Sequence, residues 1–316
     1  MSADAPATRF TWRSGLRIVG SLGAIALVLS IVDREAVLTG LRRTPVEAFL
    51  VALGGFLGLH ALSALKWRSF LVLAGAELST LTALRAYAAG LFANLCLPSL
   101  VGGDFVRAGV LVTQGASLAD VAVGGVADRL SDLLALALLV AMATGFAQGA
   151  LRAEGLAFGP WVALLPLVMI AGLAVGLFVL RRLPLRRLPR KLRRLLIRLE
   201  RAWRRLRARP TRALLGLLAS TALQAGFVLV NVYLGRAIGL VIATKLWFLL
   251  WPLAKLAAMA PVSLGGIGLR EAAFAALVAP FGDEATAVAQ SLVWEAVLVV
   301  GGLVAGLCFL VTRSRR

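Results

Sequence analysis

Two short segments of this chain share a spacing of residue types that is suited to binding an anion. Residues 98–107 read PSLVGGDFVR and residues 261–270 read PVSLGGIGLR, so both have the form Pro-x3-Gly-Gly-x3-Arg. Proline and glycine interrupt a helix, and the helix that resumes after the break has free N–H groups and a positive dipole end. An arginine one turn further on can hold a phosphate through two parallel hydrogen bonds. The spacing therefore predicts a phosphate site at Arg107 and Arg270.

The other polar residues of the two segments belong to the same candidate site. Each segment adds a serine and a carboxylate, and these carboxylates have an alternative role as helix caps or as counter-ions of the arginines. A charge inside a membrane costs roughly 3 kcal/mol on insertion scales, which favours a functional role, above all for the arginines. The candidate substrate-binding residues of the two segments are Ser99, Gly102, Gly103, Asp104, Arg107, Ser263, Gly265, Gly266, Arg270 and Glu271.

A third polar group lies in VADRLSDLL, which follows the first segment along the chain. Asp128 and Asp132 share one helix face through their i,i+4 spacing. We expect them to face a cavity beside the two broken segments. Arg129 would pair across this cavity or extend to the membrane interface. Ion pairing with the first segment and contact with a substrate both remain open for this group. Asn94 is also a candidate substrate ligand, with an interhelical hydrogen bond as its alternative.

Four further charged residues receive less specific predictions. Lys255 and Glu295 lie inside apolar stretches and could pair with each other; with Asp132 they are candidate coupling or ion-pair residues. Lys66 and Arg68 flank a tryptophan in LKWRSF, and we expect them at the inner membrane interface. There they either anchor the chain or recruit a lipid headgroup.

Composition places these residues in a membrane. Of the 316 residues 60% are hydrophobic, and the mean hydropathy is +0.90. Apolar runs of about 20 residues are long enough to cross about 30 Å of hydrocarbon, so we predict a single all-α, polytopic transmembrane domain over residues 1–316. The predicted full spans are 16–32, 46–65, 120–146, 161–180, 213–235 and 287–311. Two further apolar stretches, 82–113 and 244–281, contain the Pro-Gly breaks and are each short for two crossings, which is typical of re-entrant hairpins.

Loop charge orients these elements. Fifteen of the 34 Lys and Arg residues lie in 181–212, which predicts a cytoplasmic loop, and the basic residues near both termini place these in the cytoplasm as well. The first broken stretch then begins and ends inside, and the second begins and ends outside. We therefore predict an inverted-topology repeat of residues 46–146 and 213–312 in the cell inner membrane.

The basic loop has a helical pattern of its own. Apolar residues recur through 188–206 at helical spacing with Arg or Lys between them, which predicts an amphipathic helix on the inner leaflet. A solvated basic linker is the alternative. Because the charge belongs to a loop beside the membrane, we expect anionic lipid rather than nucleic acid as its partner.

The residue types argue against catalysis. The sequence has one histidine, two cysteines in apolar segments and no GxxxxGK[ST] nucleotide loop. We therefore expect no enzyme activity, no cofactor, no metal site and no catalytic residue. A transporter of this kind would run downhill or couple to protons or another ion.

Four elements in this order, KWRSFL, NLCLPSLVGGDFVRAGVL, ADRLSDLL and APVSLGGIGLREAAF, resemble the lysylphosphatidylglycerol synthase transmembrane region, a flippase-like family of integral membrane proteins. The resemblance covers about residues 20–312. In multidomain members, this region moves an aminoacylated phospholipid between leaflets and a soluble domain makes that lipid. The chain ends at Arg316, so we do not expect the aminoacyl-transferase activity. Stand-alone members are associated with hopanoid, glycolipid or polyprenyl-linked pathways.

These observations predict a lipid translocase that moves a phosphate-bearing lipid between membrane leaflets. The headgroup, of an aminoacyl-, glyco- or polyprenyl-linked lipid, would lie between the two hairpins while its tails stay in the bilayer. The alternative is a membrane scaffold that binds a lipid and presents it to a partner synthase or glycosyltransferase without moving it. A lipid-modifying partner enzyme and a homo-oligomer are both compatible with the sequence.

Overall fold

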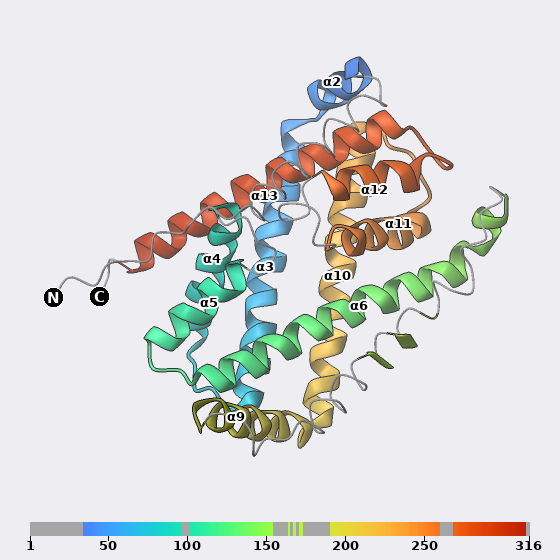
Figure 1. The fold of residues 1–316 in the computed structure, drawn as a ribbon. Helices are drawn as coiled ribbons and strands as arrows, with labels where there is room; N and C mark the ends of the chain where they lie inside the picture. Colours follow the sequence, from blue (N-terminus) through green and yellow to red (C-terminus); the bar gives the residue numbers. More distant parts are fainter. Residues whose placement is uncertain are drawn as a thin grey trace.

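The computed structural model describes residues 34–96, 102–153, 190–259 and 268–313, together with residues 164, 167–168 and 171–172. Every regular element in these ranges is helical, as predicted (Figure 1). The helices are α2 (Arg34–Arg43), α3 (Val46–Ala74), α4 (Thr80–Cys96), α5 (Gly102–Thr113), α6 (Leu118–Ala153), α9 (Arg190–Arg207), α10 (Pro210–Ile238), α11 (Thr244–Ala257), α12 (Leu269–Val278) and α13 (Glu284–Arg313).

Four of these helices are long and apolar enough to span a membrane: α3, α6, α10 and α13. Helices α3 and α10 have 29 residues each, which at 1.5 Å per residue gives about 43 Å and exceeds the hydrocarbon thickness. The four helices α3, α6, α10 and α13 confirm the spans predicted at 46–65, 120–146, 213–235 and 287–311. The spans predicted at 16–32 and 161–180 lie outside the described residues, apart from the few described between 164 and 172.

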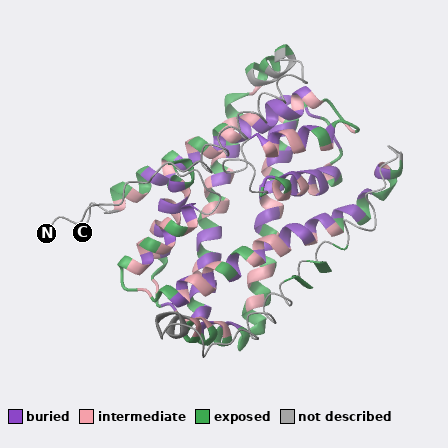
Figure 2. Cartoon of the chain, viewed as in Figure 1, coloured by how far each residue is buried: buried purple, intermediate pink, exposed green. Residues whose placement is uncertain are grey.

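The outer surface of the bundle is apolar. On α3, the side chains of Leu50, Val51 and Leu62 are each more than half exposed, while Ala52 and Phe56 on the opposite face are buried. Figure 2 shows the same division on the other long helices, with buried residues facing the interior of the bundle. Exposed apolar surface of this extent is unfavourable in water and favourable in lipid. Together with the four spans, it identifies an integral membrane protein.

Each of the two broken stretches contains a pair of short helices. Helices α4 and α5 make the first pair, and α11 and α12 make the second. The breaks themselves, 97–101 and 260–267, lie outside the described residues. Helices α4 and α5 approach closely at glycines: a Cβ atom at Gly103 would lie 2.3 Å from the carbonyl oxygen of Gly90. The two helices are therefore in tight contact just after the first break.

Each pair has two outer ends, where it joins the long helices, and these outer ends lie at opposite ends of the bundle for the two pairs (Figure 1). At one end, Arg205 of α9 lies 3.6 Å from Asp120, just after the α5–α6 turn, and 3.4 Å from the carbonyl oxygen of Ala74, just before the α3–α4 turn. Both outer ends of the first pair thus lie beside α9. At the other end, a Cβ atom at Gly282 would lie 2.8 Å from Ile242, so the α12–α13 turn contacts the α10–α11 turn.

Helix α9 confirms the amphipathic helix predicted in the basic loop. Its apolar face packs against the bundle, where Leu206 joins Phe70, Leu73 and Ala127 in one cluster. The basic side chains described on this helix, from Arg198 to Arg207, are exposed, and that of Arg204 is 71% exposed. The helix therefore presents a row of arginines at the end of the bundle where the first pair of short helices begins and ends.

Candidate functional site

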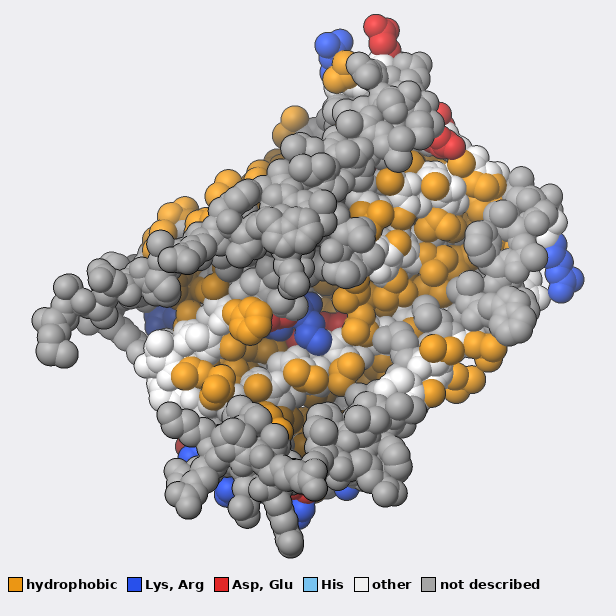
Figure 3. Space-filling model, in the orientation of Figure 1, with side chains coloured by type: hydrophobic (Ala, Val, Ile, Leu, Met, Phe, Trp, Pro, Cys, Tyr) orange, Lys and Arg blue, Asp and Glu red, His pale blue; other side chains and the backbone are white. Residues whose placement is uncertain are grey.

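Residues of both pairs of short helices and of the long helices line a cavity of about 240 Å³, and both predicted arginines are among them. Figure 3 shows basic and acidic side chains together in a recess that is surrounded by hydrophobic side chains. Spacing alone therefore identified two residues, 163 positions apart in the sequence, that share one cavity in the fold. The sequence-predicted residues in its wall are Asn94, Gly103, Asp104, Arg107, Arg129, Asp132, Lys255 and Arg270.

Arg107 of α5 is held on several sides. Its guanidinium carbon lies 4.6 Å from the ring centroid of Trp67 and 5.2 Å from that of Tyr87. Its Nη2 atom lies 2.8 Å from Asp104 and 3.7 Å from Asp128. Aromatic faces attract a cation, and this attraction is strongest away from water. Arg107 is therefore fixed by two rings and two carboxylates, and the whole residue is 5% exposed.

Asp104 joins the first pair of helices to α6. Its two carboxylate oxygens accept hydrogen bonds of 2.8 and 2.6 Å from Nε and Nη2 of Arg129. This is the two-pronged geometry that gives arginine–carboxylate pairs their strength. Of the alternatives left open for the Asp128–Arg129–Asp132 group, ion pairing with the first broken segment is the one that these contacts display. Asp104 acts as the counter-ion of both Arg107 and Arg129.

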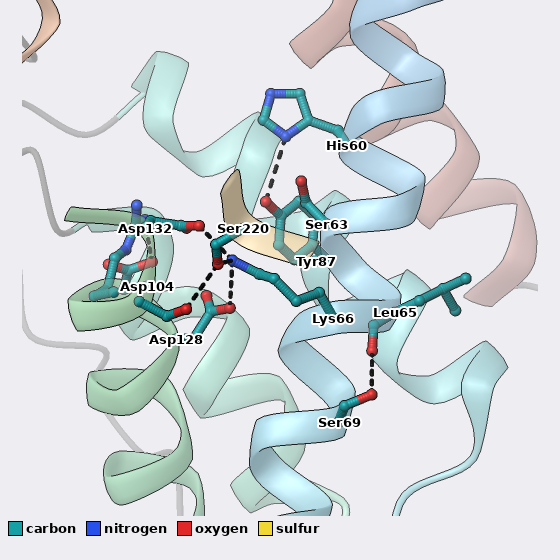
Figure 4. Close-up of polar contacts among 12 residues, drawn as sticks. His60, Ser63, Leu65, Lys66, Ser69, Tyr87, Asp104, Asp128, Asp132 and Ser220 are labelled. Atoms are coloured by element: carbon teal, nitrogen blue, oxygen red, sulfur yellow. Dashed lines mark hydrogen bonds and ion pairs between the residues drawn. The ribbon is translucent and has the colours of Figure 1, made fainter. Parts of the chain in front are cut away.

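Lys66 corrects a prediction, because it lies inside the bundle rather than at the interface. The residue is 6% exposed, and its Nζ atom forms ion pairs with Asp128, at 3.0 Å, and with Asp132 (Figure 4). It also donates a 2.8 Å hydrogen bond to Ser220 of α10. The reason is that α3 continues two turns beyond residue 66, to Ala74, so Lys66 is well inside the helix.

Arg68 lies nearer the predicted position. It donates from Nε to the carbonyl oxygen of Leu78, at 2.9 Å, in the turn between α3 and α4. This turn is at the α9 end of the bundle. Arg68 therefore joins α3 to the turn that leads into α4.

The second half of the site is built around Arg270 of α12. Its Nη2 atom lies 2.6 Å from Glu271 and 2.5 Å from Glu295, and its guanidinium carbon lies 5.8 Å from the centroid of Trp251. Glu271 also accepts a 2.7 Å hydrogen bond from the backbone N–H of Gly268, which has a φ of +82°. The predicted alternatives for Glu271, helix cap and counter-ion, are thus both realised by one side chain.

Lys255 and Glu295 do not pair with each other, contrary to the expectation. Glu295 instead binds Arg270, and Lys255 donates a 2.8 Å hydrogen bond to Oε1 of Gln224. The Nζ atom of Lys255 also lies 5.4 Å from the ring centroid of Phe227. Helix α12 places Arg270 against α13, so the carboxylate of Glu295 already has a partner.

The remaining predicted residues have supporting positions or lie outside the described ranges. Asp128 and Glu271 are each 3% exposed and stand behind the arginines rather than in the cavity wall. Asn94 accepts a 2.9 Å hydrogen bond from the backbone N–H of Gly103, so one free donor of α5 is already occupied. Gly102 is buried as the first residue of α5. The sequence-predicted residues outside the described ranges are Ser99, Ser263, Gly265 and Gly266.

Several aromatic residues of the site have no signal in the sequence. Trp67, Tyr87 and Trp251 lie against the two arginines, and Tyr87 also contacts His60, with 3.3 Å between its hydroxyl and Nδ1. Aromatic residues are common at membrane interfaces, so their occurrence in apolar runs does not mark a binding site. Only the packing of α3, α4 and α11 brings these rings to the guanidinium groups.

The site as a whole is a set of closely balanced charges in an apolar wall. Around Arg107, three cations face three carboxylates, and around Arg270, two cations accompany two carboxylates. A headgroup that carries both a negative and a positive group could exchange partners with such pairs and leave the sum of the charges unchanged. Within the described ranges, no three His, Cys, Asp or Glu side chains converge as a metal site would require.

Comparison with known proteins agrees with the motifs and the fold. No curated protein matches the chain. The family model described as the lysylphosphatidylglycerol synthase TM region, in contrast, matches residues 15–306. This match covers nearly the whole chain and includes both arginine segments and every helix described around the cavity. The protein is therefore a member of the lysylphosphatidylglycerol synthase transmembrane-region family.

Proposed function

We propose that this protein is a lipid translocase that moves a phosphate-bearing lipid between the leaflets of the membrane. The observation that carries the proposal is the cavity that Arg107 and Arg270 line together, one from each pair of short helices. The outer ends of the two pairs lie at opposite ends of the bundle. A headgroup bound between them could therefore reach one leaflet through one pair and the other leaflet through the second pair.

The chemistry of the wall supports a charged headgroup with apolar tails. The balanced ion pairs can accommodate a phosphate together with a positive group on the same headgroup, by exchanging partners. The Nε atom of Arg270 is buried and has no hydrogen-bond partner among the described residues. This N–H is therefore a donor left unused within the described part of the protein. The acyl or prenyl tails would remain in the lipid that surrounds the apolar outer surface.

We further propose that the protein lies in the inner membrane with α9 on the cytoplasmic side. The basic loop and the positive-inside tendency support this orientation, and it places both termini in the cytoplasm. The two units, 46–146 and 213–312, then form an inverted repeat with two re-entrant hairpins. The exposed arginines of α9 would bind anionic lipid and so concentrate substrate near the first hairpin.

The test is transbilayer movement of a fluorescent phosphatidylglycerol in proteoliposomes. We expect Arg107→Ala and Arg270→Ala each to reduce movement at least about tenfold, because each removes a charge-assisted contact with the headgroup. Arg152→Ala, at the exposed end of α6, is the matched control and should retain wild-type movement. Arg270→Lys keeps the charge but loses the two-pronged grip, so it tests the role of the guanidinium if the alanine variant does not fold.

Two outcomes would contradict the proposal. Folded Arg107→Ala and Arg270→Ala variants that both move lipid at the wild-type rate would exclude the arginines from the transport site. Purified wild-type protein that binds the lipid but never moves it would instead identify a scaffold that presents lipid to a partner enzyme. We propose transport rather than catalysis for this chain.

A further inference from the structure

Lys255 differs from every other cation of the cavity. Arg107, Arg129 and Arg270, the other cations that line it, each have a carboxylate within 4 Å, and so does the buried Lys66. Lys255 also lines the cavity, but no carboxylate of the described residues lies within this distance, and its hydrogen-bond partner is the neutral amide oxygen of Gln224. A cation in an apolar wall is unfavourable unless a counter-charge accompanies it. The missing counter-charge at Lys255 marks a place for a ligand anion.

The donors at this position are suited to an oxygen-rich anion. An ammonium group has three N–H donors, and Lys255 gives one of them to Gln224. Because Oε1 of Gln224 faces Lys255, its amide NH2 points to a different side, and it has no hydrogen-bond partner among the described residues. Gln224 is 7% exposed, and both side chains line the cavity. Lysine and amide N–H groups together can therefore donate to two oxygens of one phosphate.

We propose that Lys255 and Gln224 form the phosphate-binding position of the cavity, with the phosphate supplying the counter-ion that Lys255 lacks. This inference rests on the proposed function for the source of the phosphate, a lipid headgroup. It changes the role of the arginines, which are held by their own carboxylates and contact other parts of the headgroup. The ligand class is a phosphate monoester or diester.

The experiment measures equilibrium binding to the full chain in detergent micelles by calorimetry. The probe is dioctanoyl phosphatidylglycerol, with dioctanoylglycerol as the uncharged comparison. We expect Lys255→Gln to weaken binding of the phospholipid at least about tenfold, because a charge-assisted contact is lost. Lys245→Gln makes the same change at an exposed position on the same helix, α11, and should leave the affinity within about twofold of wild type.

A second variant remains informative if Lys255→Gln does not fold. Gln224→Glu places a carboxylate beside Lys255 and so supplies the missing counter-ion from the protein itself. This variant should resist thermal unfolding at least as well as wild type and still lose at least about tenfold in affinity, because its own carboxylate competes with the phosphate. Wild-type affinity in both variants, or equal binding of dioctanoylglycerol, would overturn the inference.

Inorganic phosphate distinguishes the two possible sources of the anion. If inorganic phosphate displaces the phospholipid at similar concentrations, the result supports the Lys255 site and assigns it to free phosphate. If inorganic phosphate displaces the phospholipid only weakly, the result supports the site and assigns it to the lipid. The result is separable from the proposed function. Binding that depends on Lys255 without transbilayer movement refutes translocation only, and transport with binding that does not depend on Lys255 refutes this inference only.

Discussion

The two halves of the cavity use the same motif arginine in different ways. Arg107 is packed between Trp67 and Tyr87, and its carboxylate Asp104 is shared with α6. Among the described residues, Arg270 has one aromatic neighbour at its guanidinium, and its side chain is 14% exposed, against 6% for Arg107. The first half therefore resembles a fixed ion-pair network, and the second half leaves more of its donors open. Under the proposed function, we expect the first half mainly to hold the cavity together and the second half mainly to bind the headgroup.

The largest effect should come from the buried Lys66, and the buried Lys255 allows a direct comparison. Lys66→Met leaves Asp128 and Asp132 without their shared cation, so we expect a loss of about 3–5 kcal/mol in the free energy of unfolding. Lys255→Met leaves only a neutral amide oxygen unpaired and should cost about 1–2 kcal/mol. Reversible unfolding of the full chain in mixed micelles measures both values.

Lys245→Met, at an exposed position, gives the baseline for this substitution. Equal losses for the Lys66 and Lys255 variants would show that the two halves do not differ in how they use their cations. A double variant, Lys66→Met with Asp128→Asn, should recover part of the stability, because one of the two stranded charges is removed.

A smaller effect is expected at the close approach of the first pair of helices. In Gly103→Ala, the new Cβ atom would lie 2.3 Å from the carbonyl oxygen of Gly90 and 2.4 Å from Oδ1 of Asn94, so α4 and α5 must separate. We expect a loss of about 1–3 kcal/mol in the free energy of unfolding, the usual cost of overpacking. Gly109→Ala is the matched control on the same helix, where a Cβ atom meets nothing within 4 Å.

The control should be neutral or slightly stabilising, because alanine favours a helix more than glycine does. If Gly103→Ala is as stable as Gly109→Ala, the first break does not depend on tight packing, and the two halves are more alike than their contacts indicate.

The smallest effect should follow from Glu295→Gln. Arg270 keeps its 2.6 Å contact with Glu271, and the new amide oxygen can still accept a hydrogen bond, so we expect a loss of about 1 kcal/mol in the free energy of unfolding. Because one competing carboxylate is neutralised, affinity for dioctanoyl phosphatidylglycerol should rise several-fold. Weaker binding by this variant would show that Glu295 contacts a positive group of the substrate rather than restraining Arg270.

Much of the fold was predictable because its signals are local. The four long spans follow from hydropathy, and the paired short helices follow from proline and glycine at equal spacing in two stretches. The amphipathic helix in the basic loop follows from its 3.6-residue period. The predicted position of Lys66 was wrong for a related reason: local charge suggested the end of a span, but α3 continues to Ala74.

The partners within the site could not be predicted from these signals. Pairing of Lys255 with Glu295 was a reasonable expectation from charge, yet Glu295 faces Arg270 and Lys255 faces Gln224. Which of two nearby carboxylates meets a cation depends on the rotation of each helix about its axis. A single residue of register changes that rotation by about 100°, and hydropathy does not specify it in a helix that is apolar on all sides.

The sequence by itself determined that this is a helical membrane protein with two broken segments and one arginine after each break. These features depend on residue types and short spacings, which act through backbone geometry and transfer into lipid. Only the tertiary structure decided that both arginines line one cavity, that Asp104 and Glu295 hold them, and that Lys255 has no carboxylate partner among the described residues. These contacts join residues on different helices, so they exist only once the helices pack at specific rotations and depths.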